Sequence, residues 1–115
     1  MLDQIIRINL LFDIYGSLLT ARQQEILQLY FSDDYSLGEI AAEYQISRQA
    51  VHDLIRRSIA SLENFESKLG FYEQYRKQQE LLSEAELLLK NNKLDKKETV
   101  ELINILKELR SITEQ

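Results

Sequence analysis

Apolar residues recur at steps of three and four positions along almost the whole chain, which is the spacing of amphipathic helices. Residues 2–17 form the first such stretch, and its apolar stripe consists of Ile5, Ile8, Phe12, Tyr15 and Leu19. The same spacing resumes after each short polar interruption. The pattern therefore predicts a chain of about six helices.

Short polar patterns mark the places where several of these helices begin. Three pairs of residues have the spacing of a capping box, namely Thr20 with Gln23, Ser36 with Glu39, and Asp95 with Glu98. In such a box the first side chain accepts a hydrogen bond from the amide three residues later, and the later side chain reaches back. We therefore expect new helices directly after Thr20, Ser36 and Asp95. The first of these should be buried through Ile26, Leu27 and Tyr30, and a short loop should follow at residues 32–35.

The segment 36–62 has the pattern of a helix-turn-helix unit, in which a short helix and a tight turn precede a second helix that crosses the first steeply. Ser47 is placed to cap the second helix, and Gly70 is a typical stop at its end. The inner face predicted for this second helix consists of Val51, Ile55, Ser58, Leu62, Phe65 and Leu69.

Two residues decide whether the helices of this unit can meet. The geometry requires a small residue where the helices touch, and Ala41 occupies that place. The turn requires a residue in the left-handed conformation, which is usually glycine but here is Gln45. We expect this departure to cost about 1 kcal/mol without preventing the turn. The apolar inner faces come from Ile40, Tyr44, Ile46, Val51 and Leu54.

The residues after Gly70 predict two further helices joined by a turn at residues 91–94. The inward positions of the first, over residues 71–90, are Tyr75, Leu82, Ala85 and Leu89. Those of the second are Leu102, Ile103, Leu106, Leu109 and Ile112. A short loop favours antiparallel neighbours, so this is an αα-hairpin. We predict an all-α fold in which residues 1–70 form an N-terminal helix plus a helix-turn-helix domain. Residues 71–115 form a hairpin that packs on it, and a partner is a further candidate for its surface.

Composition excludes several classes of function. The 115 residues contain no cysteine, so disulfides, cysteine-based zinc sites and thiol nucleophiles are absent. The one histidine, His52, cannot build a histidine-rich metal site. No glycine-rich phosphate loop, nucleophile motif or metal motif occurs. We therefore expect no catalytic residues, no metal and no cofactor, and hence a protein that is not an enzyme.

The first residues and the lengths of the apolar runs indicate the cellular location of the protein. Its start lacks the basic region and cleavage site of a signal peptide. The longest apolar run is about five residues, far shorter than a membrane span. We therefore expect a cytoplasmic protein without membrane insertion. The 14 basic and 19 acidic residues leave a net charge of −5, which opposes non-specific binding to nucleic acid. Any nucleic-acid role must therefore depend on a local patch.

Two resemblances emerge from the helix-turn-helix region. Residues 19–63 resemble region 4 of bacterial sigma-70 factors, and the matching positions include Leu19, Thr20, Gln23, Ile26, Leu27, Leu29, Tyr30 and Phe31. A longer pattern resembles the YlxM family of small bacterial proteins and spans nearly the whole chain. It runs through Leu11, Phe12 and Asp13, then 33–41, then Ser47, Arg48, Gln49, Ala50 and Val51. The resemblance implies nucleic-acid binding, and the genomic neighbours typical of the family imply a link to the signal recognition particle pathway.

The outer face of the second helix carries the candidate contacts. With Val51 inward, 100° steps point Gln49, His52, Asp53, Arg56, Arg57 and Ala60 outward. In a helix-turn-helix the first residues of this helix enter the major groove. Arg48 and Gln49 are the candidates to read guanine and adenine, and Ser47 with the helix N-terminus suits a phosphate. Arg56 and Arg57 would reach phosphates farther along, and His52 would make a polar contact or remain solvated.

Alternatives to DNA binding remain open at this point. Residues 47–58 hold three arginines and one aspartate, a net charge of +2, which Glu39 and Glu43 on the preceding helix cancel. DNA is the ligand in the leading interpretation. A protein is the ligand in the second, where the chain is an adaptor, and RNA or a ribonucleoprotein, such as the RNA of the signal recognition particle, is the ligand in the third. Components of that particle are candidate partners. The apolar residues of the tail either complete one core or mediate a homodimer, for which the N-terminal helix is the other candidate surface.

Overall fold

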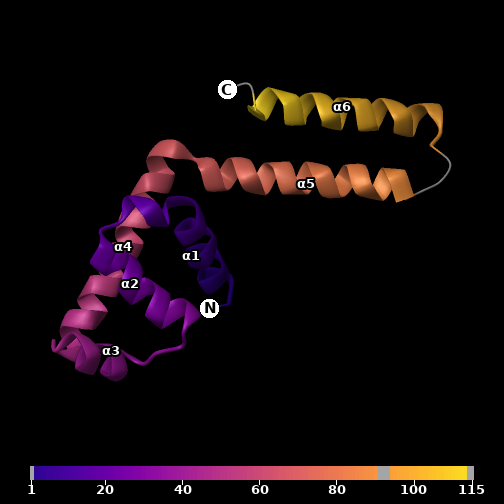
Figure 1. Cartoon of the computed structure of the whole chain (residues 1–115). Coiled ribbons are helices and arrows are strands. Elements are labelled where there is room, and N and C mark those ends of the chain that lie inside the picture. The colour runs from indigo at the N-terminus through magenta and orange to yellow at the C-terminus, as the bar shows by residue number, and fades with distance from the viewer. Residues whose placement is uncertain (1, 91–93, 114–115) are drawn as a thin grey trace. The chain divides into compact units, whose positions relative to one another are not determined.

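The computed structural model describes residues 2–90 and 94–113, and every element in that part of the chain is helical (Figure 1). The elements are α1 (Leu2–Tyr15), the 3₁₀ turn η1 (Gly16–Leu18), α2 (Ala21–Leu27), the π-helical turn η2 (Gln28–Ser32), α3 (Leu37–Tyr44), α4 (Arg48–Leu69), α5 (Phe71–Lys90) and α6 (Lys96–Thr113). The predicted all-α fold is confirmed. The chain divides into two compact units, Met1–Gly70 and Phe71–Gln115.

The predicted helix starts are confirmed by their hydrogen bonds. The Thr20 hydroxyl accepts from the amide of Gln23 at 3.2 Å, and the Gln23 side chain accepts from the amide of Thr20 at 3.0 Å. Ser36 and Glu39 form the same reciprocal pair, both bonds being 3.1 Å long. These bonds from Ser36 lower the pKa of Glu39 because they favour its charged form. At the start of α6 the Asp95 carboxylate accepts from the amide of Glu98 at 2.7 Å.

The end of the second helix differs from the prediction. The sequence predicts a continuous helix through Tyr30 and a loop at residues 32–35, whereas α2 ends at Leu27 and a π-helical turn follows. In this turn the amide of Asp33 donates to the carbonyl of Gln28 at 3.0 Å, five residues back. A π-helical turn accommodates one extra residue, and nothing in the periodicity of the sequence marks it.

The core of the first unit forms around one side of α4. Val51, Ile55 and Leu62 are buried there against α1, α2 and α3. Ser58 is fully buried in the same stripe, and its hydroxyl donates to the carbonyl of Leu54 at 2.7 Å, which satisfies the polar group within the helix. The predicted last member, Leu69, is 45% exposed, so that part of the prediction is wrong. The stripe ends one turn earlier because α1 ends at Tyr15, which contacts α4 near Phe65.

Helix α1 is joined to α4 by both apolar and polar contacts. Leu11 and Tyr15 are its buried residues, whereas the predicted member Ile5 is 46% exposed. The Tyr15 hydroxyl donates to the Glu66 carboxylate at 2.7 Å. The Arg7 guanidinium donates through Nε and Nη2 to the two oxygens of Glu63, at 2.9 and 2.8 Å. This bidentate pair holds the pKa of Glu63 below its ordinary value.

The turn of the helix-turn-helix unit has the predicted conformation. Gln45 lies in the left-handed region, with φ 56° and ψ 44°. The amide of Ile46 donates to the carbonyl of Ala41 at 3.1 Å and closes the turn. Ala41 is 7% exposed at the place where a small residue was expected. Ser47 caps α4 as predicted, since its hydroxyl accepts from the amide of Ala50 at 3.0 Å.

The hairpin of α5 and α6 confirms two predicted helices but corrects their inward faces. Along residues 79–90 of α5, the helix that contacts α6, the buried or half-buried residues are Leu81, Ala85 and Leu88. The predicted Tyr75, Leu82 and Leu89 are exposed instead. On α6 the half-buried residues are Leu102, Ile105 and Leu109, and the predicted Ile103 and Leu106 are exposed. Both helices carry neighbouring leucines or isoleucines, so periodicity alone does not select which of two adjacent stripes faces inward. The predicted turn at residues 91–94 falls mostly, and the Ile112 side chain entirely, outside the described part.

Two positive-φ residues of the first unit provide a matched test of backbone strain. Replacing Gln45→Gly should raise the free energy of unfolding by about 1 kcal/mol, because glycine adopts φ 56° without the steric cost of a Cβ. Gly70→Ala should lower it by about 1 kcal/mol, since Gly70 has φ 67° and an added Cβ would meet nothing within 4 Å. Urea unfolding followed by circular dichroism measures both. Equal stabilities of the three proteins would contradict the strain at Gln45.

The Arg7–Glu63 pair should make part of the stability depend on pH. Because the folded pKa of Glu63 lies below the ordinary value of 4.5, its contribution is present above that pH and is lost as the pH falls through the lowered pKa. The pair is part-exposed, so the contribution is about 1 kcal/mol or less. Urea unfolding of Glu63→Gln from pH 7 to pH 3 should show a deficit relative to wild type that shrinks below pH 4.5. Glu84→Gln, an exposed change on α5, is the control, and a pH-independent deficit would refute the assignment.

Candidate nucleic-acid interface

The predicted contact residues lie at the start and along the outer side of α4. The cap at Ser47 sets the first turn, and the buried stripe through Val51 fixes which side faces the core. As a consequence Gln49, Arg56 and Arg57 are exposed on the opposite side. The geometry therefore places these predicted contacts on one accessible helix face. His52 lies at the edge of the same face, with its side chain 57% exposed.

Asp53 lies at the centre of this face and organises its neighbours. One of its carboxylate oxygens accepts from the Gln49 side-chain amide at 3.1 Å. The same oxygen lies 3.8 Å from Nδ1 of His52 and 3.9 Å from Nη2 of Arg56. From the sequence, Asp53 is expected on the outer face with no role beyond that of an opposing charge. Its spacing of four from Gln49 and three from Arg56, both typical of contacts along a helix, was the signal for this role.

Arg57 lies on the other flank of the outer face, where the structure adds a residue that the sequence analysis missed. Its Nε donates weakly to the carbonyl of Asp53, at 3.4 Å. Arg57 and Leu54 line a shallow cleft of about 230 Å³ together with Arg22 and Thr20 of the preceding segment. The Arg22 guanidinium also lies 5.5 Å from the centre of the Tyr44 ring. Because Arg22 is distant in sequence, only the fold reveals that this cleft carries two arginines.

Arg48 is placed differently from the other predicted contacts. Its guanidinium lies over the first turn of α3, where a Cβ on Gly38 would be 3.6 Å from Nε of Arg48. The side chain thus crosses from the start of α4 to the start of α3. Of the two predicted base-reading residues, Gln49 is already exposed on the outer face of α4. The Arg48 side chain would have to move away from Gly38 before it could extend toward a base.

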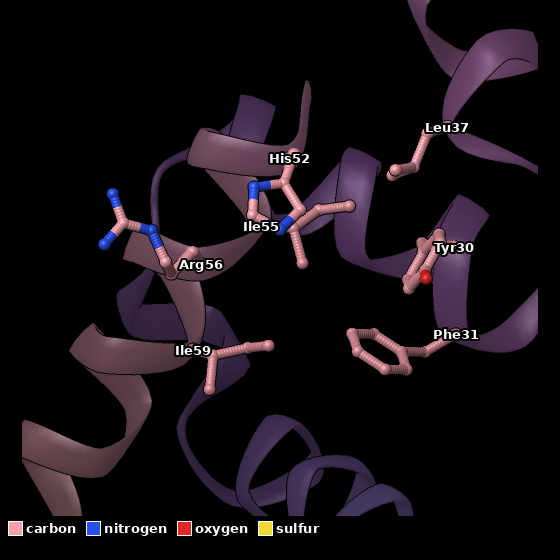
Figure 2. Close-up of a pocket in the computed structure, with 7 residues that line it drawn as sticks. All are labelled: Tyr30, Phe31, Leu37, His52, Ile55, Arg56 and Ile59. Carbon is pink, nitrogen blue, oxygen red and sulfur yellow. The ribbon is translucent and has the colours of Figure 1, made fainter. Parts of the chain in front are cut away.

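A pocket opens on the flank of α4 that carries His52 and Arg56 (Figure 2). Its volume is about 360 Å³, and its lining residues are Tyr30, Phe31, Leu37, His52, Ile55, Arg56 and Ile59. We refer to it as the aromatic pocket. The Tyr30 and Phe31 rings meet edge to face, with centroids 5.0 Å apart and an angle of 85° between their planes. Both residues belong to the π-helical turn η2.

The charges within the helix-turn-helix unit, residues 36–62, are balanced. α4 contributes Arg48, Arg56 and Arg57 against Asp53 over residues 47–58, while α3 adds Glu39 and Glu43. Among the described residues, no group of three histidine or acidic side chains is arranged to hold a metal ion. No helix in that part of the chain is long and apolar enough to cross a membrane.

The sequence of this chain matches a family of known proteins. Residues 2–106 match the family described as "UPF0122: Putative helix-turn-helix protein, YlxM / p13 like". A UPF0122 protein of Listeria welshimeri is 48% identical over 104 residues, covering 88% of this chain and 94% of the relative. A relative from Latilactobacillus sakei is 46% identical over 114 residues, covering 99% and 98%. A third, from Geobacillus, is 42% identical over 113 residues, covering 97% and 99%.

Proposed function

Because the chain belongs to the UPF0122 family of YlxM/p13-like helix-turn-helix proteins, we propose that it is a non-enzymatic regulatory or accessory protein that binds nucleic acid through α4. The observation that carries the proposal is the outer face of α4, where Gln49, Arg56 and Arg57 are exposed opposite the buried stripe. A helix presented in this way by a helix-turn-helix unit is of the kind that enters a major groove.

The residues of this face have distinct proposed roles. Gln49 is proposed to contact base edges, together with Arg48 once it leaves Gly38. Ser47 and the first amides of α4 face a phosphate, since a helix N-terminus favours an anion. Arg56 and Arg57 contact phosphates on either side of Asp53. We take duplex DNA as the leading ligand because helix-turn-helix units typically place their second helix in the major groove of DNA.

The setting that we propose is the cytoplasm and the signal recognition particle pathway. The pathway link is supported by the family resemblance and by the genomic neighbours that it implies. The RNA of that particle is therefore the second candidate ligand, and its protein components are candidate partners. The alternative function is an adaptor in which the same face docks a protein. The balanced charge of the helix-turn-helix unit favours this alternative.

A salt titration tests the proposed interface. The wild-type protein should bind duplex DNA or signal recognition particle RNA with a plot of log K against log salt whose slope reflects its phosphate contacts. Arg56→Gln with Arg57→Gln should weaken binding about ten-fold or more, because two charge-assisted hydrogen bonds are lost. The slope should become shallower by about 1.8 on duplex DNA. Fluorescence anisotropy over a salt series measures both quantities.

Two control proteins sharpen this test. Lys96→Gln with Lys97→Gln removes the same charge from two adjacent exposed residues of α6 and should leave binding unchanged. Asp53→Asn should strengthen binding, because it removes the carboxylate beside Gln49, His52 and Arg56. If binding survives the double arginine change unaltered, the proposed face is wrong. Weak, flat curves on both probes would favour the adaptor.

The exposed apolar residues of the hairpin support a second copy of the chain as partner. Leu82 and Leu89 of α5 directly follow the half-buried Leu81 and Leu88. On α6, the exposed Ile103 and Leu106 directly follow the half-buried Leu102 and Ile105. Each exposed residue follows an inward residue by one position, which rotates its side chain by 100° around the helix axis. In two antiparallel helices this rotation points both side chains to the same side of the pair, so the four exposed residues share one face. We propose that this face pairs in a two-fold dimer, which suits paired half-sites.

Changing the exposed hairpin face should abolish this dimer. The wild-type chain of 13.6 kDa should sediment with a concentration-dependent mass that approaches twice that value. Leu82→Glu with Leu89→Glu should sediment as a monomer at every concentration, because charges in the apolar face oppose its burial. Leu87→Glu is the control, since Leu87 is 68% exposed but lies on another side of α5. A monomeric wild type would overturn the proposal.

A further inference from the structure

The aromatic pocket lies directly beside the proposed nucleic-acid interface and shares two residues with it. His52 and Arg56 are predicted contacts, and both also line the pocket. Figure 2 shows Tyr30 and Phe31 on one side of the space and His52, Ile55 and Ile59 on the other. Arg56 extends from α4 away from the two rings, so its stem lines the pocket while its guanidinium lies outside.

We propose that the aromatic pocket receives one unpaired base of a bound nucleic acid, while Arg56 contacts the phosphate backbone outside it. The inference rests on the proposed function and specifies its ligand as a nucleic acid with an unpaired or extruded base. Single-stranded nucleic acid is bound where aromatic side chains stack on bases beside cations that contact phosphates. This pocket has both parts, and none of its lining residues is acidic.

The shape of the pocket fits a flat ring system. The Tyr30 and Phe31 rings are nearly perpendicular, with 85° between their planes, and so form a corner. A base stacked on one ring would meet the edge of the other, and both contacts are favourable arrangements of aromatic groups. Ile55 and Ile59 supply the apolar wall opposite. The volume of about 360 Å³ is at the lower end of small-ligand pockets, which suits one ring system.

The charge of the protein gives this contact its importance. Residues 47–58 have a net charge of +2 on a chain of net charge −5, so phosphate contacts alone provide little affinity at physiological salt. A stacked base adds affinity without adding charge, and each stacking side chain is worth roughly a five-fold change in affinity or more. Stacking in the pocket would therefore supply binding affinity that the phosphate contacts of the weakly charged face do not provide.

Two matched probes test the inference. One is a hairpin whose loop of four nucleotides carries 2-aminopurine, and the other has the same stem closed by a hexaethylene glycol linker without bases; each is made as DNA and as RNA. The wild-type protein should bind the loop hairpin at least about five-fold more tightly than the linker hairpin. Phe31→Leu and Tyr30→Leu should each remove much of this preference and leave binding to the linker hairpin unchanged. Tyr75→Leu, which changes an exposed tyrosine of α5, should affect neither probe.

A measurement on the wild-type protein keeps the test decisive if Phe31→Leu unfolds. The fluorescence of 2-aminopurine should change on binding and should be restored by an excess of unlabelled loop hairpin, whereas the same restoration should need a concentration of linker hairpin at least about five-fold higher. Equal binding of both probes, weakened alike by the Arg56 and Arg57 changes, would overturn the inference and leave the proposed function standing. Binding to neither probe would overturn both and would leave the pocket for an apolar segment of a partner protein.

Discussion

The packing of α4 is the constraint on which the rest of the first unit depends. Val51, Ile55 and Leu62 are buried on one side against three other helices, and the fully buried Ser58 is satisfied by its own helix. Because a helix has fixed angular steps, burying one side determines which residues remain outside. The positions of Gln49, Arg56 and Arg57 therefore follow from the core. The hydrogen bonds from Arg7 and Tyr15 of α1 to the C-terminal half of α4 hold α4 in the same orientation.

The second constraint is electrostatic. An acidic chain can bind a polyanion only where its cations are grouped and its carboxylates are occupied or distant. The structure meets this condition in part, since Arg57 shares a cleft with Arg22. Asp53 works against it from the centre of the face. A ligand that also uses the apolar surface beside His52 and Arg56 resolves this conflict, because stacking does not depend on net charge.

The hairpin shows how the same amphipathic pattern permits two arrangements. Leu81 and Leu82, like Leu88 and Leu89, are adjacent in sequence but lie about 100° apart around α5. One member of each pair closes the hairpin, and the other is exposed on its surface. The exposed members share a face with Ile103 and Leu106.

The sequence by itself determined the features that depend on neighbouring residues. The helix starts at Thr20, Ser36 and Ser47 and the left-handed turn at Gln45 all follow from local hydrogen bonds and backbone sterics, and each was predicted. Only the tertiary structure decided the features that depend on distant residues. The choice between adjacent stripes on α5, the approach of Arg22 to Arg57, and the corner formed by Tyr30 and Phe31 opposite Ile59 are of this kind. Periodicity specifies that a face is apolar, but which surface covers it is settled by the packing of the whole unit.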